Sequence, residues 1–263
     1  MAFCKYEKTG HVARITITRP EVMNALHPPA GRELQQAWDE FANDDDAWVA
    51  VLTGEGEKAF SAGNDLKYTA EISRLPREQR PDLSWPAGGF GGVTHRFDLF
   101  KPTIARVNGF ALGGGLEMAL WCDIIVAAEH AELGLPEPRR GLIAGALGVH
   151  RLPRQLHLKQ AMGYLLTGRH IPARRAYELG LVNEVVPLAQ LDEAVDAWVA
   201  DLVRCAPLSV RATKEAAMRG LEMPLPEAAV ARYEWEMRRR TSEDAIEGPR
   251  AFAEKRAPNW QGK

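Results

Sequence analysis

The sequence predicts a mixed α/β fold followed by an all-helical C-terminal region. Short β-branched runs such as residues 103–107 and 124–127 favour buried strands. Such runs alternate with helical segments, so that a strand–strand–helix order recurs along the first two-thirds of the chain. From residue 191 onward, apolar residues recur instead at helical spacing. We therefore divide the chain into a core, residues 1–200, and a helical region, residues 201–263, which we expect to serve oligomerisation.

Composition excludes several classes of protein. The chain has 263 residues, of which 46% are hydrophobic, enough to bury one sizeable core. Its 33 basic and 35 acidic residues give a net charge of −2, so it has no overall positive field for a nucleic acid. The one tight basic cluster, residues 238–240, lies among acidic residues and is typical of a solvated helix face. We expect no nucleic-acid partner.

The cysteines indicate neither a disulfide framework nor a metal site. Cys4, Cys122 and Cys205 are odd in number and distant, without CxxC or Cys/His spacing. The first ten residues, MAFCKYEKTG, have neither an apolar signal region nor a basic presequence. No window approaches 18 uninterrupted apolar residues. We expect a cytoplasmic protein that binds no metal and enters no membrane.

The first elements are separated by clear turn signals. Residues 11–17 form a candidate strand, and Asn24 is placed to cap a helix that runs to about residue 41. Residues 48–53 form a compact buried strand. Residues 59–67 run from a strand end through a small-residue turn into a helix, and the free amides of that turn could stabilise a negatively charged oxygen.

The segment 73–92 is an excursion rich in Pro, Arg and Gly. Long loops of this kind either cover a pocket or remain surface connections. The sequence leaves both readings open.

The stretch 101–137 carries the strongest chemical signal. Three glycines, 113–115, precede an apolar helix start, and glycines leave backbone amides at a helix start open to an anionic oxygen. Glu117 lies within this apolar run, and Glu137 follows between two prolines. A buried carboxylate is costly unless it is paired or used for proton chemistry. The alternative is a helix packed closely on its glycines, with Glu117 turned to solvent.

The remaining elements are mostly helical. A glycine-punctuated turn enters a helix within residues 141–154, and a strand is predicted at 181–186. Further helices are predicted at residues 159–167, 173–179, 191–203, 209–220, 226–239 and 242–256.

Several motifs in fixed order resemble the crotonase, or enoyl-CoA hydratase/isomerase, superfamily. The resemblance covers nearly the full chain. It implies a spiral of β-β-α turns, a C-terminal helical region, and homotrimers that often stack as hexamers. The motifs are AFSAGNDL (59–66), NGFALGGGLEMALWCDIIVAA (108–128), LGLPEPRRGL (133–142), LTGRHIPARRAYELGLVNEVV (166–186) and FAEKRAPNW (252–260).

The resemblance implies how the carboxylates and amides would act on an acyl-CoA. Two backbone amides, matched here by Ala62 and Gly114, would polarise the thioester carbonyl. Hydratases of the family carry two acidic residues, at the positions of Glu117 and Glu137. Glu117 would orient water and accept its proton, and Glu137 would act as the acid at the α-carbon. Members that only shift a double bond commonly keep the second acid alone.

The resemblance also implies where CoA would bind. No tightly bound cofactor is expected, because CoA is part of the substrate. A basic CoA contact common in the family is replaced here by Glu21. The matched residues are Ser61, Ala62, Asn64, Asp65 and Leu66 in the turn, and Phe252 and Lys255, which would reach the CoA of a neighbouring subunit.

The predicted function is therefore reversible hydration of an enoyl-CoA, a lyase reaction of fatty-acid β-oxidation. The segment IAGALGVHRL (143–152) departs from short-chain hydratases, and Pro138 is followed by two arginines. FSAGNDLK and FALGGGLE are closer to carnitinyl-CoA dehydratase-like or aromatic-acid branches. Isomerisation and hydratase–lyase cleavage remain alternatives within the family.

Two other classes of protein fit the sequence less well. A non-enzymatic RNA-binding paralogue is disfavoured by the weak acidity and the lack of a basic helix face. A Rossmann dehydrogenase lacks its G-x-G-x-x-G spacing. His95 and His150 are isolated histidines, for which a structural role is favoured.

Overall fold

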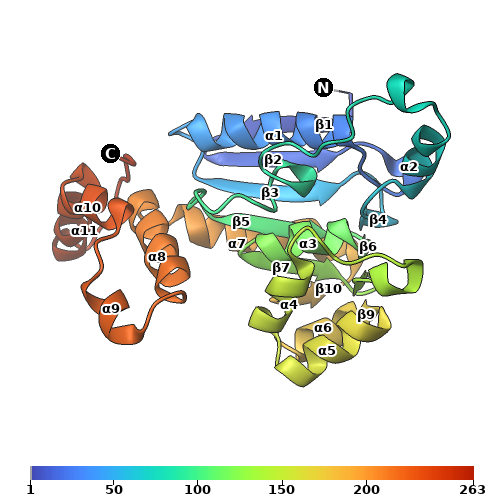
Figure 1. The fold of residues 1–263 in the computed structure, drawn as a ribbon. Coiled ribbons are helices and arrows are strands. Elements are labelled where there is room, and N and C mark those ends of the chain that lie inside the picture. The colour runs from blue at the N-terminus through green and yellow to red at the C-terminus, as the bar shows by residue number, and fades with distance from the viewer. Residues whose placement is uncertain (1) are drawn as a thin grey trace.

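The computed structural model describes residues 2–263, and its strands form two sheets (Figure 1). The larger sheet has the order β1-β2-β3-β5-β7-β10 and the smaller one β4-β6-β8-β9. Within them only the pairs β1–β2 and β8–β9 are antiparallel. The larger sheet comprises β1 (Cys4–Thr9), β2 (Val12–Ile17), β3 (Val49–Gly54), β5 (Thr103–Val107), β7 (Ile124–Ala128) and β10 (Glu184–Val186), and the smaller one β4 (Ala59–Ser61), β6 (Phe110–Leu112), β8 (Glu132–Gly134) and β9 (Ile171–Pro172).

The chain alternates between the two sheets as it winds. β3, β5 and β7 of the larger sheet are each followed directly by β4, β6 and β8 of the smaller one. A helix or helical turn then leads to the next strand of the larger sheet, as α2 (Leu66–Ser73) and α3 (Gly114–Trp121) do. This confirms the predicted spiral of β-β-α turns. β1, β6 and β8 were not predicted, because each is short or half-polar.

Helices cover both faces of the larger sheet, so its central strands are apolar throughout. All of β3 is buried. Because side chains alternate along a strand, Val49 and Val51 face α7 (Leu191–Val203), whereas Ala50 and Leu52 belong to the main core. α7 spans the residues that its apolar period predicted.

The start of α1 (Pro28–Asn43) corrects the predicted cap. Asn24 does not cap this helix; it has a φ of 55° and lies in the segment before it. His27 is the N-cap, with its ring nitrogen accepting from the Ala30 amide at 3.3 Å. Pro28 follows, in the first turn, where a missing N–H costs nothing. α1 therefore begins four residues later than Asn24.

The C-terminal helices lie together, away from the sheets (Figure 1). The single helix predicted over 226–239 is wrong, because the structure breaks it into α9 (Leu225–Val230) and α10 (Glu234–Arg240). The break lets α10 turn back onto α8 (Pro207–Gly220), where the buried Glu215 accepts from the Trp235 amide at 2.7 Å.

Other helical elements complete the chain. None of the helices in the described part is both long and apolar enough to cross a membrane. Residues 2–263 also contain no cluster of three or more His, Cys, Asp or Glu side chains arranged to hold a metal ion. The elements are α4 (Gly148–Gln155), α5 (Leu158–Thr167), α6 (Ala173–Glu178) and α11 (Glu243–Glu254), with the short 3₁₀ turns η1 (Pro20–Val22), η2 (Arg77–Gln79), η3 (Phe90–Gly92), η4 (Glu137–Arg140) and η5 (Leu188–Gln190).

Candidate active site

The small-residue turn after β4 packs directly against the glycines that begin α3. A Cβ at Gly63 would lie 2.9 Å from the Gly114 nitrogen, and a Cβ at Gly115 would overlap the Ser61 carbonyl oxygen. No side chain larger than hydrogen fits at these contacts. The sequence thus brings two separate glycine motifs together at one point.

Among the backbone amides that have no acceptor within residues 2–263, two lie at this contact, those of Gly114 and Asn64. Gly114 is the first residue of α3, where an amide has no partner within the helix. Asn64 forms a parallel bridge with Leu26, and the bridge uses the carbonyl of Gly63 and the amide of Asp65, so the Asn64 amide points away from it.

The Ala62 amide, which the sequence analysis expected to be a donor, is already engaged. It donates to the Met23 carbonyl oxygen at 2.9 Å. The free amide of the turn is therefore the one two positions later, at Asn64. Which amide of the turn is free depends on hydrogen bonds to residues 23–26, and no motif within the turn reveals them.

Glu117 is buried on the first turns of α3, with 3% of its surface exposed. Its Oε1 accepts from the Gly148 amide at 2.7 Å. Burial raises the pKa of Glu117 to about 7; the Gly148 amide opposes this shift, and the nearby charge of Glu137 adds to it. The reading in which Glu117 faces solvent is thus excluded.

Glu137 begins η4, and its side chain points back at the start of α3. A Cβ at Gly113 would lie 2.9 Å from Glu137 Oε1. Its other oxygen, Oε2, is buried and has no hydrogen-bond partner among the described residues. Burial raises the pKa of Glu137 as well. The fold thus brings two carboxyls and two free amides, from the turn after β4, from α3 and from η4, to the N-terminus of α3.

The second half of the 73–92 excursion packs beside this point. The Phe90 ring lies against Gly114 so closely that a Cβ there would overlap it, and the Trp85 ring centroid is 4.5 Å from that of Phe90. Phe90 is 6% exposed, whereas the first half of the excursion is largely exposed. The inner half is therefore part of the core that surrounds the site.

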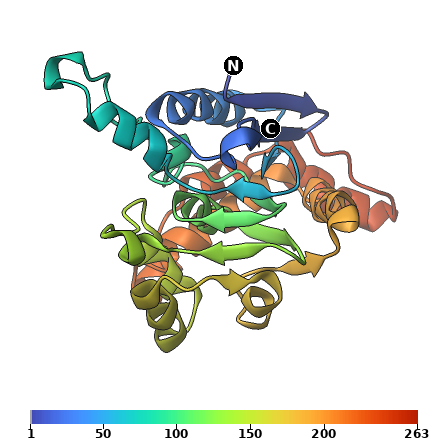
Figure 2. The same cartoon turned by 90° about the vertical axis from the view of Figure 1, so that its right-hand side faces the viewer.

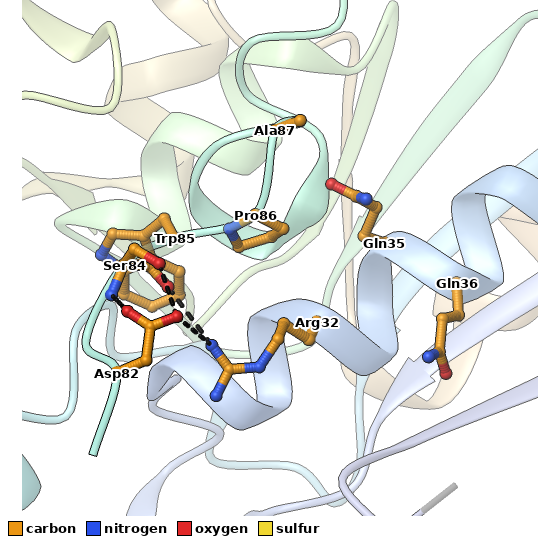
Figure 3. A pocket seen from close by; sticks show the side chains of 8 residues that line it. All are labelled: Arg32, Gln35, Gln36, Asp82, Ser84, Trp85, Pro86 and Ala87. Atoms are coloured by element: carbon orange, nitrogen blue, oxygen red, sulfur yellow. Dashed lines mark hydrogen bonds and ion pairs between the residues drawn. The ribbon is translucent and has the colours of Figure 1, made fainter.

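A hollow of about 280 Å³ lies between α1 and this excursion (Figure 3). Its wall is mostly polar, and an Asp82 carboxylate oxygen lies 4.0 Å from the Arg32 guanidinium. Neither Glu117 nor Glu137 lines this hollow, and of the Trp85–Phe90 pair only Trp85 does. The lining residues are Arg32, Gln35, Gln36, Asp82, Ser84, Trp85, Pro86 and Ala87.

The turn residues expected to contact CoA serve partly structural roles. Ser61 is buried and bonded within the turn, while Asp65 caps α2 and pairs with Arg19 at 3.0 Å. Asn64 and Leu66 are exposed beside them.

Phe252 and Lys255 are not brought to this turn within one chain. Phe252 is 88% exposed on α11, and both views place α11 on the far side of the molecule from α2 (Figures 1 and 2). Within one chain, these two residues therefore lie far from the turn.

The histidines stay outside the site. His95 and His150 are both exposed, and neither contacts Glu117 or Glu137. Two residues that the sequence analysis did not single out do matter: Gly148, whose amide holds Glu117, and Arg151. Burial lowers the pKa of the Arg151 guanidinium to about 10, and Glu117 opposes this shift. The sequence marks their segment only as a glycine-punctuated turn that enters a helix, so neither residue could be linked to Glu117 from the sequence.

Comparisons with known proteins identify one family. Residues 7–263 match the family model described as "Enoyl-CoA hydratase/isomerase". A protein of Salmonella typhi named carnitinyl-CoA dehydratase is 41% identical over 97% of both chains. The crystal structure of an enoyl-CoA hydratase from Mycobacterium tuberculosis H37Rv is similar over 99% of both chains, with a TM-score of 0.90 and 38% identity. An enoyl-CoA hydratase from Bacillus anthracis has a TM-score of 0.85 and 34% identity, covering 99% of this chain and 100% of that one.

Proposed function

The chain belongs to the enoyl-CoA hydratase/isomerase family, and on this premise we propose that it is a hydro-lyase that adds water reversibly across the 2,3 double bond of an enoyl-CoA. The observation that carries the proposal is the meeting of the buried Glu117 and the half-buried Glu137 with two free amides at the start of α3. An isomerase needs one proton-transfer group, whereas hydration needs one for water and one for the α-carbon.

The amides would stabilise the negative charge that builds on the thioester oxygen. We assign this role to Asn64 and Gly114, since the Ala62 amide is engaged by Met23. Such a preorganised donor typically contributes ~3–4 kcal/mol to transition-state stabilisation. No metal ion is needed for this step, because the amides themselves face the developing charge.

The carboxyls divide the proton transfers. Water forms its C–O bond to the β-carbon while Glu117 accepts one of its protons, and the π electrons move to the thioester oxygen. Glu137 then donates a proton to the α-carbon and the carbonyl re-forms. With a pKa of about 7, Glu117 is partly ionised at neutral pH, as a general base must be. Dehydration reverses each step.

A second candidate substrate carries a γ-trimethylammonio group, as in carnitinyl-CoA dehydration. The relative from Salmonella typhi favours this chemistry. So does the Trp85–Phe90 pair beside Gly114, because aromatic faces attract quaternary ammonium groups.

CoA binding would be completed by another copy of the chain. We propose a homotrimer or a hexamer of two trimers, in which Phe252 and Lys255 of one subunit reach the CoA bound at the Ser61–Leu66 turn of the next. This assignment follows the family motif and fits the distance between these segments in one chain (Figure 1).

The test is a panel of enoyl-CoA thioesters with short, long, branched, aryl and γ-trimethylammonio acyl groups. Loss of the conjugated-enoyl absorbance is followed, and the product is identified by mass. We expect the gain of one water on at least one thioester, which also names the acyl class. An aldehyde plus acetyl-CoA would instead indicate a lyase, and an isomer of unchanged mass an isomerase.

A further inference from the structure

The irregular segment between β2 and α1 packs against the turn that contains the Asn64 amide. Met23 and Asn24, within this segment, are consecutive non-glycine residues with φ values of 56° and 55°. This left-handed conformation is unfavourable for residues with a Cβ, and asparagine tolerates it best. Such conformations persist where the surrounding contacts impose them, often at functional sites.

The Asn24 side chain supplies those contacts. It is fully buried, and its Oδ1 accepts from the Arg19 amide at 3.0 Å. Its Nδ2 donates to the carbonyl oxygens of Glu55 at 3.0 Å and Ala59 at 2.7 Å. The amide group therefore connects the segment to the strand that leads into the turn.

The backbone on either side of the Asn24 side chain holds the turn itself. The Asn24 carbonyl accepts from Ser61 Oγ at 2.8 Å, and this oxygen accepts from the Gly63 amide at 3.1 Å. The Met23 carbonyl accepts from the Ala62 amide at 2.9 Å. These three bonds fix the turn on the side away from the Asn64 amide.

Leu26 completes the set of hydrogen bonds between this segment and the turn. The Leu26 amide donates to the Gly63 carbonyl, and the Leu26 carbonyl accepts from the Asp65 amide, both at 2.8 Å. Every amide from Ala62 to Asp65 is thus engaged by this network except that of Asn64. The segment therefore fixes the orientation of the Asn64 amide and leaves this amide free to donate to another acceptor.

We propose that Asn24 is a positioning residue of the active site, which holds the Ser61–Asp65 turn so that the Asn64 amide stays aligned with the Gly114 amide. This inference rests on the proposed function. Asn24 acts through the turn and touches no reacting atom. A displacement of a donor by about 1 Å can cost a hundredfold in rate, so the role has a measurable consequence.

The probe is acetoacetyl-CoA, a thioester that is not hydrated and forms an ultraviolet-absorbing enolate. The enolate-to-keto ratio of the bound ligand reports directly on the two amides. For Asn24→Ala we expect this ratio at fixed pH to fall about tenfold or more. The dissociation constant of CoA alone should change much less, and the loss in the hydration reaction should appear in kcat more than in KM.

Asn108→Ala is the matched control. Asn108 is equally buried and donates to the carbonyls of Gly54, Gly56 and Ala59, but it makes no bond to the Ser61–Asp65 turn. It should lower the melting temperature comparably and leave the enolate ratio of the folded protein unchanged. Asn24→Asp keeps the acceptor for the Arg19 amide but turns a carboxylate oxygen toward the Glu55 and Ala59 carbonyl oxygens, so we expect its enolate ratio to fall at least as far as that of Asn24→Ala.

Each outcome is decisive. A folded Asn24 variant with the wild-type enolate ratio would overturn the positioning role while leaving the proposed function intact. An equal fall in Asn108→Ala would reduce Asn24 to a residue of general stability. Failure of the wild type to bind acetoacetyl-CoA would overturn the proposed function and this inference with it.

Discussion

Glu117 is a carboxyl held where its charge is disfavoured and yet hydrogen-bonded by one backbone amide. Burial raises its pKa to about 7, and the Gly148 amide limits the rise. A general base works best when its pKa lies near the working pH. In the proposed reaction, burial thus brings the pKa of this side chain to the range that a general base needs, at a cost to the stability of the fold.

That cost gives a pH-dependent prediction. Between the ordinary pKa of 4.5 and about 7, folded Glu117 keeps a proton that the unfolded chain has released, so its contribution to stability falls as the pH rises through this range. We expect Glu117→Gln to be more stable than wild type by roughly 2–3 kcal/mol at pH 8 and by much less at pH 5. Denaturant unfolding at both pH values measures this difference. Glu129→Gln, at an exposed position, is the control, and a gain of equal size at both pH values would contradict the account.

Glu137 differs from Glu117 in having one carboxyl oxygen without a partner. Oε2 is buried and free among the described residues, and burial raises the pKa of the group. A carboxyl in this state can hold a proton and deliver it. This is the property required at the α-carbon.

The division of roles predicts different exchange behaviour for the two variants. With butyryl-CoA or its γ-trimethylammonio analogue in D₂O, wild type should exchange an α-proton, because this step needs the amides and Glu137 alone. Glu117→Gln should retain most of the α-proton exchange rate, whereas in Glu137→Gln this rate should fall about 10²–10⁴-fold. Mass spectrometry of the thioester gives the rate. Loss of exchange in Glu117→Gln alone would reverse the assignment.

The residues of the site were predictable to different degrees. In the sequence, Glu117 stands out as a charge in an apolar run, Glu137 as a carboxylate between two prolines, and Gly114 as part of a glycine cluster. The donor at Asn64 does not, because a backbone amide is free or engaged according to its partners in space. Here the partners lie in the irregular segment at residues 23–26, far from the turn in sequence.

At the scale of elements, the site is made where two helices begin. α3 contributes Gly114 and Glu117, and α4 contributes the Gly148 amide that holds Glu117. The fit at Gly148 is tight, since a Cβ there would lie 2.9 Å from Glu117 Oε1 and 3.0 Å from the Ala144 Cβ. The junction leaves no room for a methyl group.

Gly148→Ala should therefore displace the Glu117 carboxyl. We expect kcat to fall about tenfold or more and overpacking to cost about 1–3 kcal/mol. Gly145→Ala, three residues earlier, is the control, because the nearest atom to its added Cβ would be 3.8 Å away. Activity assays and thermal unfolding of both variants measure the two effects. Equal activity of Gly148→Ala and Gly145→Ala would show that the contact between Gly148 and Glu117 has no effect on catalysis.

Elements with a clear period were predicted well, and elements fixed by distant contacts were not. α7 and β5 fall where their apolar patterns place them. The start of α1 depends on left-handed residues at 23 and 24, and the break between α9 and α10 depends on the packing of α10 on Glu215. Neither the backbone conformation at residues 23 and 24 nor the packing of α10 on Glu215 can be predicted from the local sequence pattern.

At the scale of the whole molecule, the C-terminal helices expose apolar side chains that one subunit leaves uncovered. Such a surface usually marks an interface with another chain, and we propose that the other chain is a copy of this one. Members with more than half of their surface exposed are Met218, Leu221, Leu225, Val230, Ile246 and Phe252.

We therefore expect a solution mass of three or six times 29.1 kDa by light scattering. Leu221→Glu, in this surface, should lower the mass, whereas Leu158→Glu, on α5, should keep the trimer. In the intact oligomer, Lys255→Glu should weaken CoA binding, although Lys255 lies far from the Ser61–Leu66 turn of its own chain. A monomeric wild type with unimpaired CoA binding would contradict the proposed assembly.

The central claim is that two carboxyls act together on water and the α-carbon of an enoyl-CoA. Its most direct test is product mass after incubation of the best thioester of the panel with wild type, Glu117→Gln and Glu137→Gln. The account predicts a gain of one water with wild type and none with either variant, each of which still binds the thioester. Hydration that survives either substitution would contradict it.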